Sequence, residues 1–140
     1  MNHSTVIAIA IFIAVGGGSA HADTVTDWNQ TAIEIMKVAK VSANPWSRTL
    51  AMMHVAMSDA INSVQGRYTR YVADIAVAPG ASADAAAVAA AQQILLQLFP
   101  NQRAVIDEAY AASLTAIPEG TAKSQGIALG EQVLDELLTE

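Results

Sequence analysis

The sequence contains no cysteine, which excludes disulfide bonds, thiolate metal ligands and cysteine nucleophiles. Basic residues are also few: 7 Lys and Arg stand against 13 Asp and Glu, a net charge of −6. Binding to a nucleic-acid backbone requires clustered Lys and Arg, so this balance argues against a nucleic-acid partner. Any core of the chain must therefore be held by packing alone.

Familiar catalytic motifs are missing as well. The chain has no phosphate-binding loop, no nucleophile elbow and no His-Glu-x-x-His sequence. Beyond residue 22 the sole histidine is His54, and no carboxylate is expected on its face of the helix, so a Ser-His-Asp triad is not supported. The residues alone assign no catalytic, cofactor-binding or metal-binding residue.

The first 22 residues have the features of a signal peptide. The apolar run at residues 6–15 is too short to span a bilayer, and glycines 16–18 end it. The Ala-His-Ala sequence of residues 20–22 fits a cleavage site. We expect cleavage after Ala22 and export to the periplasm or the exterior; the alternative is an uncleaved, lipid-facing anchor. No later apolar run reaches membrane-spanning length, so no membrane association is expected after cleavage.

Residues 23–140 are enough for one small domain and contain no strand pattern. Five segments have the apolar period of helices, near residues 27–40, 45–66, 82–99, 101–116 and 121–140. Thr24 and Asp27 form a possible capping pair for the first segment, whereas Asn44 is predicted to cap the second with Pro45 at its first position. Ser82 is predicted to start the third. We therefore expect an all-α bundle of about five helices.

The second predicted helix combines an apolar stripe with a polar ladder. The stripe consists of Trp46, Leu50, Met53, Met57, Ala60, Ile61 and Val64. His54, Ser58 and Asn62 follow one another at four-residue intervals, about 70° from the stripe centre. As a metal ligand His54 would need a partner such as Asp59, which lies roughly 140° around the helix. We favour a buried or half-buried His54 that is hydrogen-bonded to Ser58 or to a carbonyl group.

Other polar residues of this helix allow two interpretations. Asp59 and Asn62 either orient the turn at Gly66 or bind a cation, or, as we favour, they bond to the backbone or to the next helix. Without cysteine or a second histidine, a soft-metal site has too few ligands, and the methionines are interpreted as core residues. These are Met52, Met53 and Met57.

Residues 67–81 form a long irregular connection, and loops of this length are often functional. Arg67 and Arg70 flank Tyr68 and either bind an anion or belong to a solvated loop. We favour the solvated loop, in which Tyr68 and Tyr71 cover the helix pair.

The last helices predict close packing and an unfinished bundle. Seven of the nine residues from 83 to 91 are alanine, so the third helix offers a small face to a neighbour. Gly126 and Gly130 indicate a close helix contact in the fifth segment, where leucines 134, 137 and 138 require a further partner. This segment reaches Glu140 without a cap, and its acidic end opposes the helix dipole. We expect residues 23–140 to be an N-terminal helical domain that is truncated at its C-terminal end.

Several short sequences together resemble a known family. They are Trp28-Asn29, the Ala-Met-Met-His-Val-Ala-Met-Ser-Asp-Ala-Ile-Asn of residues 51–62, Gly66-Arg67-Tyr68 with Tyr71, the alanine-rich helix, Leu98-Phe99-Pro100 with Gln102-Arg103, and Ile-Pro-Glu-Gly at 117–120 before Gly-Ile-Ala-Leu-Gly at 126–130. The pattern, spread over residues 25–138, is similar to the N-terminal helical region of vanadium-dependent haloperoxidases and related acid phosphatases of the type 2 phosphatidic-acid-phosphatase superfamily.

The resemblance implies an all-α fold around a pocket for vanadate or phosphate. The family's site motifs are a Lys followed by Arg-Pro, a Pro-Ser-Gly-His segment, and a Ser-Arg segment followed by a histidine, and this chain has no Arg-Pro pair and no Gly-His pair. His54 resembles the histidine of the family's N-terminal helix, which belongs to the scaffold. No catalytic residue is therefore carried over, and whether the chain is itself an enzyme stays open.

Two hypotheses follow. In the first, the chain is the scaffold portion of an exported haloperoxidase-like or acid phosphatase-like enzyme and is inactive alone. Its partner would then be the missing C-terminal catalytic region or another helical chain, and vanadate or phosphate would belong to the full-length enzyme. In the second, the chain is a self-sufficient exported helical module that binds a partner through the Tyr68–Tyr71 loop or the last helix.

Overall fold

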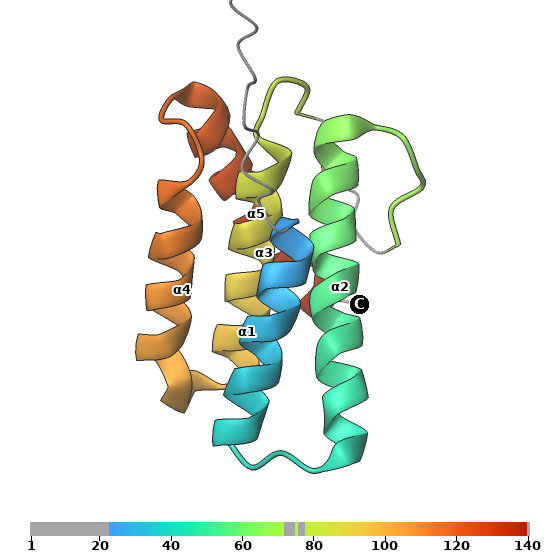
Figure 1. Cartoon of the computed structure of the whole chain (residues 1–140). Helices are drawn as coiled ribbons and strands as arrows, with labels where there is room; N and C mark the ends of the chain where they lie inside the picture. Colours follow the sequence, from blue (N-terminus) through green and yellow to red (C-terminus); the bar gives the residue numbers. More distant parts are fainter. Residues whose placement is uncertain (1–22, 72–74, 76–77, 140) are drawn as a thin grey trace, which may run out of the picture.

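A computed structural model describes residues 23–71, 75 and 78–139, so the expected signal peptide lies outside the described residues. Within these ranges the chain forms five α-helices and a short 3-10 helix, and contains no strand (Figure 1). The elements are α1 (Thr24–Val38), α2 (Ala43–Gln65), α3 (Ala83–Leu98), η1 (Pro100–Gln102), α4 (Arg103–Thr115) and α5 (Thr121–Thr139). The predicted all-α fold of about five helices is confirmed.

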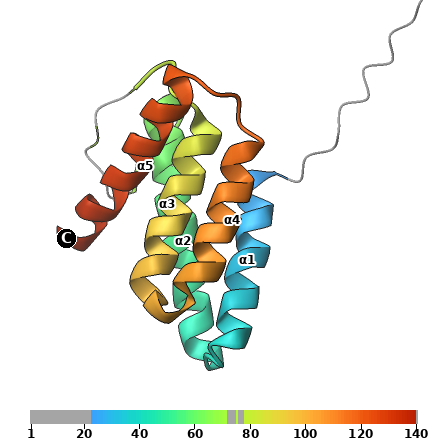
Figure 2. The ribbon, with the colours of Figure 1, turned by 90° about the vertical axis from the view of Figure 1, so that its left-hand side faces the viewer.

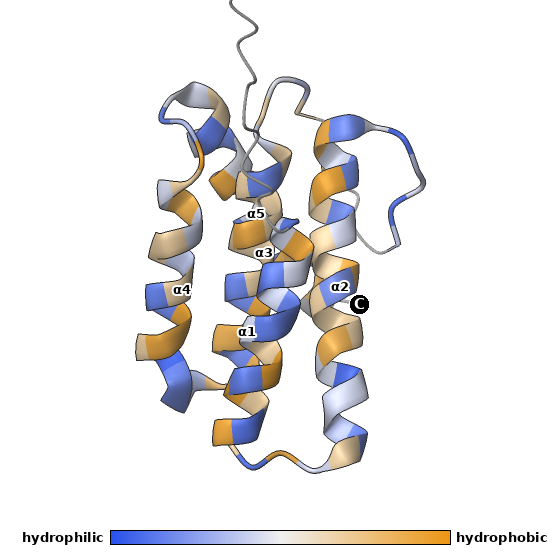
Figure 3. Cartoon of the chain, viewed as in Figure 1, coloured by the Kyte–Doolittle hydropathy of each residue, from blue (hydrophilic) through white to orange (hydrophobic). Residues whose placement is uncertain are grey.

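Helix α3 is the centre of the molecule and lies against each of the other four α-helices. Most of its residues are buried, as expected for a helix that is apolar on all sides. Viewed from the side, α5 is inclined against α3 on the side opposite α1 (Figure 2). In the hydropathy view, hydrophilic residues mark the outward side of α1 (Figure 3). The alanine-rich sequence thus places α3 where four neighbours can approach it.

Glycines of α5 allow the closest of these approaches. A Cβ atom built on Gly126 would lie 2.9 Å from the Cβ of Ala85, and one built on Gly130 would lie 2.7 Å from the Cβ of Ala89. The predicted close contact at these glycines is therefore present, and its partner is α3. By contrast, α4 lies against α3 and α1 whereas α5 lies against α3 and α2. The two last helices are thus on different sides of α3.

Local signals at the helix ends were partly predictable. Ser82 caps α3 as expected, since its hydroxyl accepts a hydrogen bond from the Ala85 N–H at 3.1 Å. Helix α1 begins three residues earlier than predicted, and Asp23 is its cap. The prediction for α2 was wrong: the helix begins at Ala43, so Asn44 and Pro45 both lie within its first turn. There the N–H groups have no intrahelical acceptors, and a proline costs little.

The apolar stripes meet in one core. Trp28, Ile35, Met53 and Met57 are all at most 1% exposed. In α5, Leu129 and Val133 are buried, whereas Ile127 is partly exposed.

Candidate functional site

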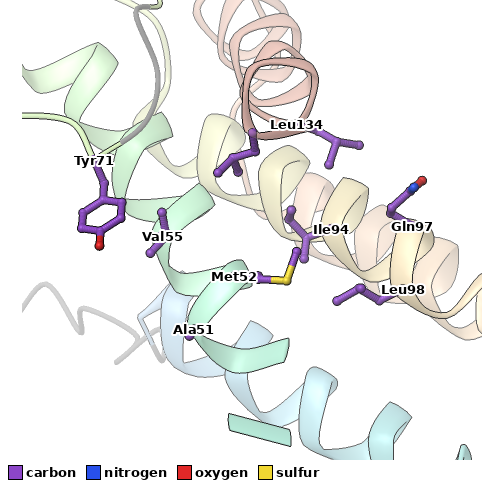
Figure 4. Close-up of a pocket in the computed structure, with 9 residues that line it drawn as sticks. Ala51, Met52, Val55, Tyr71, Ile94, Gln97, Leu98 and Leu134 are labelled. Carbon is purple, nitrogen blue, oxygen red and sulfur yellow. The ribbon is translucent and has the colours of Figure 1, made fainter. Parts of the chain in front are cut away.

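An apolar groove with a volume of about 330 Å³ lies where α2, α3 and α5 meet (Figure 4). We call it the apolar groove. Three residues of α2, three of α3, two of α5 and one of the loop line it: Ala51, Met52, Val55, Ile94, Gln97, Leu98, Leu134, Leu137 and Tyr71. Its helices belong to the same core, so the groove is an open continuation of the packed interior.

Long side chains of three helices converge on the apolar groove. In Figure 4, Met52 extends from α2 into the space between α2 and α3, and Leu134 of α5 lies above Ile94. Met52 and Leu134 are only half-buried, in contrast to Met53, which is fully buried. Of the methionines interpreted as core residues, Met53 and Met57 are therefore confirmed, while Met52 faces the groove. Such a site binds through burial of apolar surface.

Charged groups do not line the apolar groove among its described residues, whose polar members are Gln97 and Tyr71. Basic side chains that would hold an oxyanion lie elsewhere. Arg103 faces Asp107 across 3.9 Å on the exposed surface of α4. The lining residues supply no base and no cation, so the chemistry that this groove supports is apolar binding.

His54 occupies a different place from the predicted one. Its side chain is exposed, and within the described chain it makes no hydrogen bond, so the expected bond to Ser58 or to a carbonyl is absent. Ser58 is exposed too, whereas Asn62 is only 7% exposed. All three residues of the polar ladder line a second groove, of about 240 Å³, beside Val25 of α1. The ladder was predicted correctly as a strip, but only its Asn62 end is buried.

Asp59 lies on another side of α2 and holds the loop that follows this helix. Its side chain is 1% exposed, and its Oδ1 atom accepts a hydrogen bond from the Tyr71 N–H at 2.7 Å. Nearby, the Ala78 N–H donates to the Ser63 carbonyl at 3.0 Å. The favoured interpretation of Asp59, a bond to backbone, is what the structure contains. The connection is thereby fastened to α2 at two points, Tyr71 and Ala78.

The two tyrosines of the loop do not cover the helix pair, and that prediction was wrong. Tyr68 is 76% exposed and Tyr71 is 82% exposed. Because Asp59 binds the backbone of Tyr71, the loop is held by its main chain and the phenol ring is left at the rim of the apolar groove. Arg67 is exposed and Arg70 is partly buried.

Lys123 is a buried cation that the sequence interpretation missed. Its side chain lies at the start of α5, and the residue is 7% exposed. The Nζ atom donates to the Leu114 carbonyl at 2.6 Å, to the Ile117 carbonyl at 3.4 Å and to Glu119 Oε1 at 2.5 Å. Lys123 therefore supplies hydrogen-bond donors to the carbonyl groups at the end of α4. The four-residue spacing between Glu119 and Lys123 was the available signal.

The described ranges meet neither the requirements of a metal site nor those of a membrane-spanning helix. They contain no group of three or more His, Asp or Glu side chains arranged to hold a metal ion. Asp27 and Asp84 share a third hollow between α1 and α3, where the Thr24 hydroxyl donates to Asp84 at 3.3 Å. None of the described helices combines the length and the apolarity needed to cross a bilayer.

No protein-family profile matches the chain, and its comparison with characterised proteins and with solved structures gives no significant match. The resemblance to the haloperoxidase and acid phosphatase superfamily therefore depends on the short sequences quoted above. The geometry defines a class of protein only coarsely: an all-α domain with an apolar groove.

Proposed function

We propose that this chain is the exported helical scaffold portion of a vanadium haloperoxidase-like or acid phosphatase-like enzyme. The short sequences distributed over residues 25–138 support the family, and the all-α architecture agrees with it. The oxyanion would be held by a catalytic region that carries the Arg-Pro and Gly-His motifs, because this chain contains neither after residue 22. There, basic side chains would offset the charge of the transition state.

The apolar groove carries the proposal. The groove continues the core and is lined almost entirely by apolar side chains of α2, α3 and α5. It therefore fits the apolar face of one more helix. Leu134 and Leu137 were expected to require a partner, and both line this groove. We assign the place to a helix of the catalytic region, since the uncharged walls select an uncharged helix face.

The DNA after codon 140 and the activity of the purified chain test this function. We expect a neighbouring coding segment with a Lys followed by Arg-Pro, a Pro-Ser-Gly-His segment and a Ser-Arg segment followed by a histidine. The chain alone should neither oxidise bromide in the presence of vanadate and peroxide nor hydrolyse phosphomonoesters, whereas the polypeptide or complex with that segment should do one of the two. Activity of the chain alone, or the absence of such a segment, would refute the proposal.

The alternative is a self-sufficient exported binding module. One observation favours it: Tyr68 and Tyr71 are largely exposed, and aromatic side chains are common anchors in interfaces. A cooperative thermal transition and a monomeric elution volume for residues 23–140 would favour this module. Aggregation or molten behaviour would favour the scaffold, because an unfinished bundle exposes apolar surface.

A further inference from the structure

The second groove, beside the polar ladder of α2, has a composition that the scaffold function does not explain. We call it the ladder groove. On one side it has apolar side chains, Val25 of α1 with Met57 and Ile61 of α2. Along its length runs the polar row of His54, Ser58 and Asn62. Among the residues that the structure describes, it shares none with the apolar groove, and no Asp, Glu, Lys or Arg lines it.

Asn62 is the decisive residue of the ladder groove. Only 7% of its surface is exposed, yet no side chain or backbone group of the described chain makes a hydrogen bond with its amide. Its polar atoms are not sealed in the core, because the residue lines the groove. A buried amide offers two donors and one acceptor, and leaving them without partners is unfavourable. The groove is therefore the direction from which a ligand can satisfy Asn62.

Spacing along α2 indicates the shape of such a ligand. Residues four apart on a helix are separated by about 6 Å along its axis. An extended peptide repeats every two residues in about 6.6 Å, and alternate peptide groups face the same side. Ser58 and Asn62 can therefore meet two successive peptide groups of equal orientation with a mismatch below about 1 Å.

We propose that the ladder groove binds an extended, uncharged peptide segment. The amide of Asn62 pairs with a backbone N–H and C=O of the peptide, the Ser58 hydroxyl bonds to a neighbouring peptide group, and Val25, Met57 and Ile61 receive apolar side chains of the ligand. The absence of charged lining residues selects neutral side chains. Saccharides also bind amide and hydroxyl groups, but the straight row of His54, Ser58 and Asn62 beside apolar side chains matches the repeat of an extended peptide.

The test is an NMR titration of the isotopically labelled full chain with the blocked peptide acetyl-Ser-Leu-Ser-Leu-Ser-amide. We expect saturable shifts at Val25, Ser58 and the side-chain NH₂ of Asn62. Asn62→Ala should weaken binding about tenfold, the effect of losing good hydrogen bonds to a buried amide. Asn44→Ala is the matched control, because Asn44 is an exposed asparagine of the same helix, and it should bind like the wild type.

A second arm keeps the proposal open to refutation if Asn62→Ala does not fold. The same peptide methylated on its leucine nitrogens, offered to the wild-type chain, should bind about tenfold more weakly because it lacks two N–H donors. Four results would each overturn the proposal. They are shifts confined to other parts of the chain, equal binding of the methylated peptide, equal binding by folded Asn62→Ala, and tighter binding of methyl glucoside than of the peptide. The result does not depend on the enzyme proposed above, since neither catalytic activity nor the apolar groove is measured.

Discussion

Gly130 of α5 lies against Ala89 of α3 so closely that a Cβ atom on the glycine would stand 2.7 Å from the alanine's own Cβ. It would lie closer still to the carbonyl oxygen of Ala86. Backbone atoms cannot move aside as the end of a flexible side chain can. The position of α5, and with it one wall of the apolar groove, therefore depends on the absence of a side chain at residue 130.

Gly130→Ala should destabilise the fold. Overpacking of a tight contact costs about 1–3 kcal/mol, while the better helix propensity of alanine returns about 1 kcal/mol. We expect a net loss of up to about 2 kcal/mol in urea unfolding followed by circular dichroism. Gln132→Ala, at an exposed position of the same helix, is the control and should change stability little. An alanine variant as stable as the wild type would show that α3 and α5 are packed less closely.

Lys123→Met should also lower stability, by about 1–3 kcal/mol, because the Leu114 and Ile117 carbonyls lose the Lys123 donor at the end of α4. Glu119→Gln should have a small effect, since the Glu119 side chain is 87% exposed. The exposed Lys37 provides the matched control, Lys37→Met. If Glu119→Gln were as harmful as Lys123→Met, the ion pair rather than the carbonyl bonds would be responsible.

Tyr110 predicts a pH dependence. Burial, and secondly the negative charge of Glu131, raise the pKa of this phenol above its ordinary value. Its contribution to stability is therefore fully present below the unfolded-state pKa of about 10 and is lost as the pH rises through the folded-state pKa. Tyrosinate absorbance, with Tyr110→Phe to identify the step, should show that Glu131→Gln lowers this pKa. An unchanged step would mean that Glu131 does not act on Tyr110.

The apolar groove should bind a hydrophobic fluorescent dye, and charge placed within it should prevent this. We expect Met52→Glu and Leu134→Glu to reduce dye binding strongly while the helical content is retained, because both positions are half-buried. Val38→Glu is the control, since Val38 is an apolar residue with 67% exposure that does not line the groove. Dye binding that falls equally in the Val38 variant would place the dye elsewhere.

Helical periodicity was sufficient to predict the five helices, because each of them contributes apolar residues to a common core. The alanine run and the glycines of α5 also predicted a close contact correctly, because small side chains on both helices allow their backbones to approach. The exposed His54 and the bare tyrosines were not predictable. The exposure of the tyrosines depends on the path of the loop backbone, which the hydrogen bond from Tyr71 to Asp59 holds against α2, and the exposure of His54 depends on how much of α2 its neighbours cover.

The apolar groove was foreseen only as leucines in need of a partner on the last helix. Its other walls, Met52 and Leu98, read as ordinary core positions in sequence, because a stripe does not reveal which of its residues a neighbour leaves uncovered. Lys123 was missed for a related reason: a lysine becomes buried only where free carbonyl groups of another helix meet it.

Titration calorimetry of the purified chain with orthovanadate, and separately with phosphate, tests the central claim most directly. A scaffold whose oxyanion site belongs to another region should give no saturable heat with either anion. Tight, saturable binding of vanadate or phosphate by this chain alone would contradict the account.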